Sequence, residues 1–156
     1  MPSAVDWRAA EAVAVRLARR EPIASSFHYR SLADDFTELT ATAQGLAEAH
    51  TGWNPLSGDA RARVVDRADW IRANLASFRR LLRPLTDRME DRMVPGPVTA
   101  MGAAVAGAQL GAMLGWMSTR VLGQYDLLVL EDEDTDEQDI VYYVGPNILA
   151  LEKRFT

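Results

Sequence analysis

The sequence predicts a mainly α-helical protein, a bundle around one central apolar helix, with a small β-hairpin near the C-terminus. Three observations predict this fold. Residues 93–119 form a run of 27 residues without a formal charge. Apolar residues recur at helical spacing through the first two-thirds of the chain. After Gly123, two runs rich in Val, Ile, Leu and Tyr flank an acidic stretch, a pattern typical of a hairpin.

Length and composition limit the class of protein. A chain of 156 residues fits a single helical domain, residues 1–156, and a domain of this size buries roughly 70% of the surface of its unfolded chain. The absence of cysteine excludes disulfides and thiolate metal sites. The N-terminal segment has early acids at Asp6 and Glu11 and no continuous apolar stretch, so we expect no signal peptide and a cytoplasmic location.

The first helix is expected to begin at Val5 or Asp6 and to end near Glu21 and Pro22. Its predicted apolar stripe consists of Ala10, Val13 and Leu17.

The second helix is expected to begin at Ser31, whose hydroxyl can cap it, with Asp34 favourable in the first turn. It should end at Thr51 and Gly52, with His50 in the last turn and Gly52 in a left-handed conformation. A loop should follow over residues 53–58. The predicted apolar stripe of this helix consists of Phe36, Leu39, Ala43 and Leu46.

The third helix is expected to begin after a capping Asp66 and to bend or end near Arg83, because Pro84 follows. A short polar helix should cover residues 87–92. The apolar stripe of the third helix consists of Ile71, Leu75, Phe78, Leu82 and Leu85, and its opposite face carries Arg72, Arg79, Arg80 and Arg83.

The central helix is expected from Val98 to Leu122, with Gly123 as its stop. Three glycines recur at every fourth position and would form a groove for close backbone approach, namely Gly107, Gly111 and Gly115. Each glycine costs roughly 1 kcal/mol of helix propensity, so close packing must offset about 3 kcal/mol. The helix is therefore expected to be buried on all sides, in a protein core or in a membrane. Its many Ala and Gly residues, with Thr99 and Gln109, favour the core.

The predicted hairpin covers residues 124–145 and has an acidic tip, Glu131–Asp139, with seven acids and no base. Asn147 is then expected to cap a last helix. Because that helix shows no stop signal, we expect this polypeptide to be part of something longer.

The acidic tip is the first candidate site. Asp132, Asp134 and Asp136 alternate as in an EF-hand loop, but Glu137 stands where glycine is required and Tyr143 where a bidentate Glu is required. A solvated tip is favoured over weak divalent-ion binding.

The remaining candidates are also weak. The two histidines, His28 and His50, are 22 positions apart in different predicted elements, and no HExxH motif is present. Residues 61–92 carry nine Arg against five acids, which favours a solvated helix face over a phosphate site, and we expect no nucleic-acid partner. Phosphate-binding glycine loops and the G-x-S-x-G elbow are absent. We therefore predict no catalytic, cofactor-binding or metal-binding residue in this chain.

Four segments together resemble the N-terminal region of the zincin-like metallopeptidase type 2 family. They are VDWRAAEAVAVRLA, VVDRADWIRANLASFRRLLRPL, GAQLGAMLGWMSTRVLGQYDLLVL and VYYVGPNILALEKRF, and residues 109–127 are the most specific part. The family consists of bacterial proteins described as hydrolases, common in actinobacteria, some labelled as associated with biosynthesis of a deazaflavin coenzyme. The resemblance implies a mostly helical minimal zincin whose zinc helix, with an HExxH-type motif, follows shortly after Thr156. It also implies that the hairpin after Tyr125 corresponds to the edge-strand region along which zincins place an extended substrate.

Two functions remain open. The first is the scaffold portion of a zinc-dependent hydrolase, inactive alone, whose partner is the missing C-terminal catalytic segment. The rival is a non-enzymatic helical interaction module, a homo-oligomer formed through the Gly107, Gly111 and Gly115 face. Neither hypothesis requires a cofactor bound to this chain or contact with a membrane, although the resemblance implies zinc for the full-length family.

Overall fold

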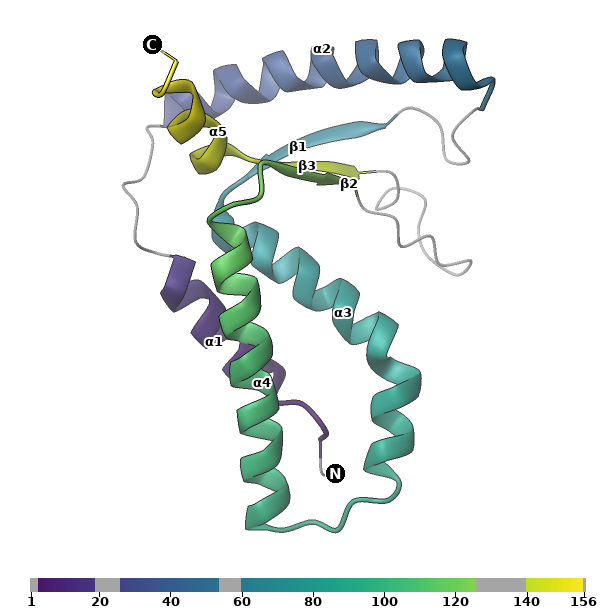
Figure 1. Ribbon diagram of the computed structural model, residues 1–156, viewed down its shortest axis with the longest axis vertical. Coiled ribbons are helices and arrows are strands. Elements are labelled where there is room, and N and C mark those ends of the chain that lie inside the picture. Colours follow the sequence, from purple (N-terminus) through teal and green to yellow (C-terminus); the bar gives the residue numbers. More distant parts are fainter. Residues whose placement is uncertain (1–2, 19–25, 54–59, 126–139, 156) are drawn as a thin grey trace. The chain divides into compact units, whose positions relative to one another are not determined.

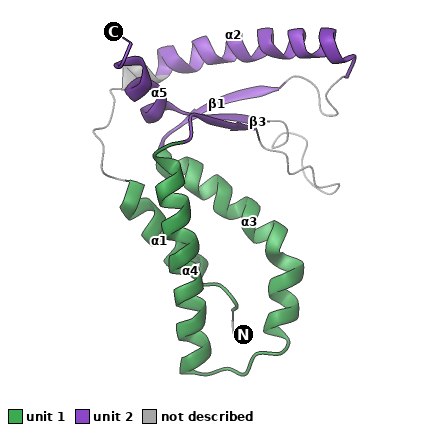
Figure 2. Cartoon of the chain, viewed as in Figure 1, with its two compact units in different colours: residues 1–21, 67–120 green, residues 22–66, 121–156 purple. Residues whose placement is uncertain are grey.

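The computed structural model describes residues 3–18, 26–53, 60–125 and 140–155 (Figure 1). These residues form two compact units, one from residues 1–21 and 67–120 and one from residues 22–66 and 121–156 (Figure 2). We call them unit 1 and unit 2 and describe each by itself. The fold is mainly α-helical with one small sheet in the described part, which confirms the predicted fold class. The expectation of a single domain stays a prediction.

Unit 1 consists of three helices in its described residues: α1 (Trp7–Ala18), α3 (Arg67–Glu90) and α4 (Pro97–Ser118). Helix α1 packs mainly along α4 and also contacts α3, whereas α3 and α4 contact each other less. Figure 1 shows α3 and α4 diverging toward the loop that joins them. The glycine-rich helix therefore has α1 as its main neighbour.

Helix α1 begins as predicted, because Oδ1 of Asp6 accepts hydrogen bonds from the backbone N–H groups of Arg8 and Ala9, each at 3.0 Å. Its predicted stripe is wrong at Val13 and Leu17, which are partly or largely exposed. The buried positions instead recur at every fourth residue and are Ala10, Ala14 and Ala18. Small side chains occupy these buried positions because they allow the backbones of α1 and α4 to approach each other.

The glycine groove on α4 is confirmed. A Cβ atom on Gly107 would overlap the backbone carbonyl oxygen of Asp6, and one on Gly111 would overlap that of Ala10. On Gly115 a Cβ would lie 2.8 Å from the carbonyl oxygen of Ala14. Because real Cβ atoms do not approach other atoms so closely, only glycine fits these three positions without a backbone shift.

The expectation that the central helix is buried on all sides is wrong. Helix α4 is buried along its glycine face, while Val98 and Trp116 on the opposite side are exposed, since α1 covers one side only. In the described part of the chain α4 is the one helix long and apolar enough to cross a membrane, and 28% of the tested window is buried. This finding rests on length and composition alone, and the core helix of a soluble protein can meet the same two criteria.

The predicted end of the central helix near Gly123 is also wrong, whereas Pro84 bends the third helix, which is one of the two outcomes predicted for it. Helix α3 begins directly after Asp66, as expected, but it runs through Pro84 to Glu90 and absorbs most of the predicted short helix. Proline lacks the N–H that would bond to the carbonyl of Arg80, and α3 bends in this half without ending (Figure 1). Helix α4 ends at Ser118, earlier than Leu122, and Gly123 opens a strand. Among the predicted stripe residues, Ile71 and Leu75 are buried and Leu85 is exposed.

Unit 2 contains, in its described residues, α2 (Ser26–Thr51), β1 (Arg61–Val65), β2 (Gly123–Tyr125), β3 (Ile140–Val144) and α5 (Gly145–Glu152). The strand order is β1-β3-β2, with β1 parallel and β2 antiparallel to β3. The pairing of β2 with β3 is the one that the predicted hairpin requires. The acidic tip, residues 131–139, lies outside the described residues.

Helix α2 packs against the sheet through Phe36, the first residue of the predicted stripe, but the rest of that stripe is wrong. The Phe36 ring lies 4.4 Å from the Tyr143 ring, centroid to centroid, and Thr40 Oγ1 is 2.8 Å from the Tyr143 hydroxyl. Leu39 and Leu46, two of the predicted stripe residues, are exposed. Thr40 is buried against the sheet because the Tyr143 hydroxyl offers it a hydrogen-bond partner.

The ends of α2 and α5 complete this unit. Helix α2 begins at Ser26, five positions before the predicted Ser31, and ends as predicted at Thr51, with Gly52 at φ 71°. Helix α5 begins at Gly145, so Asn147 lies within its first turn and is not the predicted cap. Its Nδ2 instead donates a 2.6 Å hydrogen bond to the carbonyl oxygen of Val121.

Candidate functional site

The edge of the sheet at β2 is the strongest candidate for binding an extended chain. The backbone N–H of Val144 donates to the carbonyl oxygen of Leu122 at 2.8 Å, so this pair is hydrogen-bonded across the strands. Hydrogen-bonded and non-hydrogen-bonded pairs alternate along an antiparallel ladder. The two pairs Gly123–Tyr143 and Tyr125–Val141 are therefore non-hydrogen-bonded pairs. It follows that the backbone groups of Gly123 and Tyr125 point away from β3, toward the edge.

Two contacts hold the start of this edge in place. The hydrogen bond from the backbone N–H of Val144 holds Leu122, the residue directly before β2. The hydrogen bond from the buried Asn147 side chain holds Val121, one position earlier. Gly123 lies so close to β3 that a Cβ there would be 2.9 Å from the carbonyl oxygen of Tyr142. Strand β2 has three residues, and contacts with α5 and β3 hold its start in place.

A polar row crosses the sheet at one register level. Arg63 of β1, Tyr142 of β3 and Gln124 of β2 are aligned neighbours. The guanidinium carbon of Arg63 lies 5.9 Å from the centroid of the Tyr142 ring, within range of a cation–π interaction. Strand β1 was missed in the sequence analysis, so this row was missed too. The alternation of Arg and smaller residues in RARVV is the signal that could have indicated it.

The histidines cannot share a metal ion. His28 and His50 lie in the same helix, α2, and not in different elements as predicted. Their separation of 22 residues corresponds to roughly 33 Å along a helix. Within the ranges that the structure describes, no three His, Asp or Glu residues come together as a metal site would require. The described residues therefore do not fit the zinc that the family resemblance implies.

Unit 1 has an open cleft of about 710 Å³ between its N-terminal segment, α3 and the start of α4. An adjoining cleft of about 640 Å³ shares Ser3, Trp7 and Arg79 with it. Arg79, Arg80 and Arg83 line this second cleft and are exposed, as the predicted solvated face requires. Asp87 and Glu90 lie along the same lining, so the arginines do not form a purely basic surface.

The ionisable group that stands out in unit 1 is Arg72. Hydrogen bonds to the carboxylates of Glu11, at 2.9 Å, and of Asp69, at 3.0 Å, raise the pKa of Arg72 above its ordinary value. All three side chains are about half exposed, so solvent screens the pairs strongly. This group is a surface ion-pair cluster between α1 and α3.

Comparison with known proteins gives the class of this fold. A family model described as zincin-like metallopeptidase matches residues 5–156. No curated protein matches. A crystal structure from Chloroflexus aurantiacus, described as "a putative hydrolase with a novel fold", is similar with a TM-score of 0.70 and 27% sequence identity. The similarity covers 96% of this chain but 45% of the Chloroflexus chain, so this chain spans less than half of that protein. Because the family model matches nearly every residue, the chain belongs to the zincin-like metallopeptidase family.

Proposed function

We propose that this chain is the scaffold portion of a zinc-dependent metallopeptidase or related hydrolase and that it does not hydrolyse peptides by itself. One observation carries the proposal. The zincin-like family model matches residues 5–156, yet the sequence has two histidines and neither belongs to an HExxH motif. Membership in the family and the absence of its signature motif from these residues are reconciled if the motif lies elsewhere in a longer protein.

The chemistry explains why the chain alone should be inactive. A catalytic zinc site of this class needs three protein ligands and an open position for water, together with a general base. His28 and His50 are at opposite ends of α2, and no group of three His, Asp or Glu residues that could hold a metal ion occurs among the described residues. We infer that the zinc helix belongs to polypeptide outside these residues, and the 45% coverage of the Chloroflexus chain supports this inference.

The β2 edge would contribute to substrate binding. Its outward backbone groups at Gly123 can pair with an extended peptide as one more antiparallel or parallel strand. Such pairing recognises the peptide backbone and is largely independent of its sequence. The proposed substrate class is therefore an extended polypeptide.

Zinc content and proteolysis test the proposal together. The purified 156-residue chain should hold no stoichiometric zinc after passage over a chelating column and reloading with zinc, and should not release fluorescence from labelled casein. The longest polypeptide that the gene encodes around these residues serves as the positive control and should do both. Stoichiometric zinc with metal-dependent turnover in the 156-residue chain would contradict the proposal.

The rival function is an interaction module that forms a homo-oligomer through the glycine face. In this structure α1 of the same chain occupies that face, at Gly107, Gly111 and Gly115. A second copy could use it only if α1 were exchanged between the two copies. Mass measurement in solution separates the functions, because the scaffold proposal expects a monomer and the rival expects an oligomer.

A further inference from the structure

We propose that the side of α4 opposite its glycines is covered, in the longer protein, by the rest of the polypeptide. This rests on the proposed function, in which the chain is one portion of a larger enzyme. We call this side the outer face. Its members share large apolar side chains and high exposure, and they are Val98 (83%), Met101 (68%), Val105 (50%), Met113 (46%) and Trp116 (58%).

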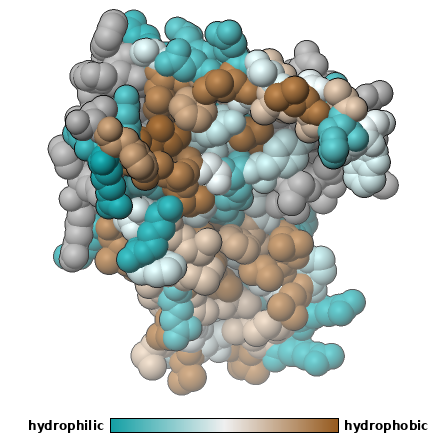
Figure 3. Space-filling model, turned by 45° about the horizontal axis from the view of Figure 1, so that its top comes forward, coloured by the Kyte–Doolittle hydropathy of each residue, from teal (hydrophilic) through white to brown (hydrophobic). Residues whose placement is uncertain are grey.

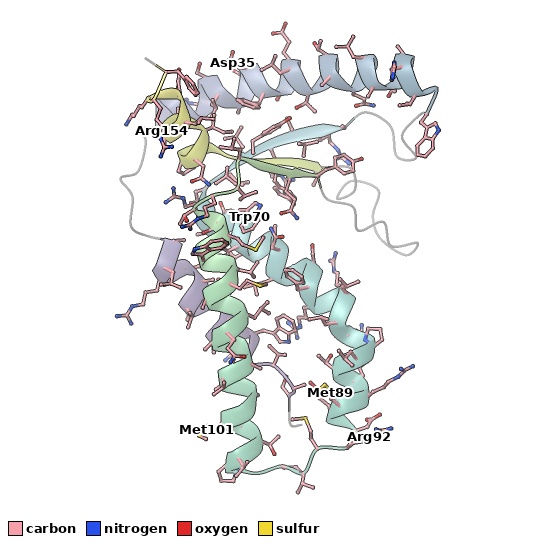
Figure 4. The ribbon with its side chains drawn as sticks, viewed as in Figure 1. Asp35, Trp70, Met89, Arg92, Met101 and Arg154 are labelled. Carbon is pink, nitrogen blue, oxygen red and sulfur yellow. The ribbon has the colours of Figure 1, made fainter. Side chains whose placement is uncertain are left out.

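The outer face follows from helix geometry. Successive residues are about 100° apart, so Val98, Val105 and Trp116 lie on the side away from Gly107. The face runs from Val98 to Trp116, a length of roughly 27 Å at 1.5 Å per residue. Figure 4 shows Met101 projecting from the N-terminal part of α4. Met101 and Met113 lie at the two margins of the face, and the exposed Gln109 lies near its middle. The face is therefore mainly apolar along almost the whole helix, with one polar side chain within it.

A strip of this kind is unusual on a protein surface. Scattered apolar residues are common, but contiguous exposed patches mark sites of interaction. Helix α3 adds Leu81, Leu85 and Met89, which are also largely exposed. Figure 3 shows brown, hydrophobic residues on the surface of the protein. Unit 1 thus presents apolar surface on two of its helices.

The chemistry of the face selects an apolar occupant. No formal charge occurs between residues 93 and 119, so the face has nothing to attract a nucleic acid or a charged peptide. The nearest cation that contacts it, Arg120, lies 4.1 Å above the centroid of the Trp116 ring. The occupant must therefore offer hydrophobic side chains.

The length of the matched structure identifies that occupant. The similarity covers 96% of this chain and 45% of the Chloroflexus chain, so more than half of that chain has no counterpart here. An extra portion of that size needs a surface against which to bury its own apolar residues. The outer face supplies one, and a covalently linked partner is present at high effective concentration. We therefore favour the rest of the same polypeptide over a second copy.

A matched pair of substitutions tests the inference. Met101→Asp puts a charge on the outer face, and Met101→Leu keeps it apolar at nearly the same volume. In the 156-residue chain each variant should shift the melting temperature by less than about 2 °C, because the side chain faces water. In the longest polypeptide that the gene encodes, Met101→Asp should lower it by about 5 °C or more, since a buried unpaired charge is costly, and Met101→Leu should not.

The other outcomes overturn the inference. A longer protein that tolerates Met101→Asp leaves the face without the proposed occupant. If the 156-residue chain is a dimer by light scattering and Met101→Asp makes it a monomer, the occupant is a second copy. If the chain binds vesicles of neutral phospholipid, the occupant is a membrane. None of these results depends on zinc content, so failure here is distinct from failure of the proposed function.

Discussion

Replacing Gly111 by Ala tests how closely α1 and α4 approach each other. The added Cβ would overlap the carbonyl oxygen of Ala10 and would lie 3.0 Å from both its carbonyl carbon and its Cα. These are backbone atoms, which cannot rotate away as a side chain could. The helices must therefore separate or shift along each other.

The magnitude follows from two opposing effects. Ala gains about 1 kcal/mol over Gly in helix propensity. Overpacking costs about 1–3 kcal/mol and sometimes more, and contact between two backbones belongs at the upper end. Gly111→Ala should therefore lower the free energy of unfolding by about 1–2 kcal/mol.

Gly102→Ala is the matched control on the same helix. A Cβ at Gly102 has no atom within 4 Å, so only the gain in helix propensity remains, about 0.5–1 kcal/mol. The two variants should differ by roughly 5–10 °C in melting temperature, measured by circular dichroism at 222 nm. If Gly111→Ala is as stable as Gly102→Ala, α1 does not lie in the glycine groove.

Further substitutions test individual contacts. Tyr143→Phe removes the 2.8 Å hydrogen bond to the hydroxyl on α2 and should cost about 0.5–1.5 kcal/mol in urea unfolding; an unchanged midpoint would show that this contact does not form. Asn147→Ala removes the 2.6 Å hydrogen bond to the residue two positions before β2 and should cost about 1–2 kcal/mol while speeding amide exchange in β2; unaltered exchange would contradict the anchoring of that edge. Gly52→Ala should cost roughly 1–2 kcal/mol because φ is 71°, whereas Gly45→Ala in the same helical region should stabilise; equal effects would refute the left-handed cap.

The ends of helices were predictable where their chemistry is local. Asp6 accepts two hydrogen bonds from the first turn of α1, and Gly52 adopts a positive φ after α2. Each feature depends on residues within a few positions of the helix end. Pro84 bends α3, which was one of the two predicted outcomes, and the helix continues to Glu90 because packing along it tolerates the lost hydrogen bond.

The buried faces of α1 and α2 were less predictable. Reading large apolar residues as the core selected Leu17 and Leu39, yet Ala14 and Thr40 face inward. Ala14 is buried because α4 offers a glycine groove, and Thr40 because Tyr143 offers a hydroxyl. Such complementarity depends on a second element and is not visible in the periodicity of one helix.

The sheet and the candidate edge show the same limit. Strand β1 has five residues and pairs in parallel with β3, so that Arg61 lies beside Ile140. The alternation in RARVV is a weak signal because it covers five residues, so the pairing with β3 decides the conformation of this segment. The hairpin strands could be predicted, but the outward direction of the Gly123 and Tyr125 backbone groups depends on the register, which only the structure supplies.

The central claim is that these residues form the scaffold of a zinc hydrolase whose metal site requires further polypeptide. Zinc measured by mass spectrometry, on the 156-residue chain and on the longest polypeptide that the gene encodes, tests this most directly. We predict stoichiometric zinc in the longer protein and none retained by the shorter one. Equal zinc in both, with casein cleavage by the shorter chain, would contradict the account.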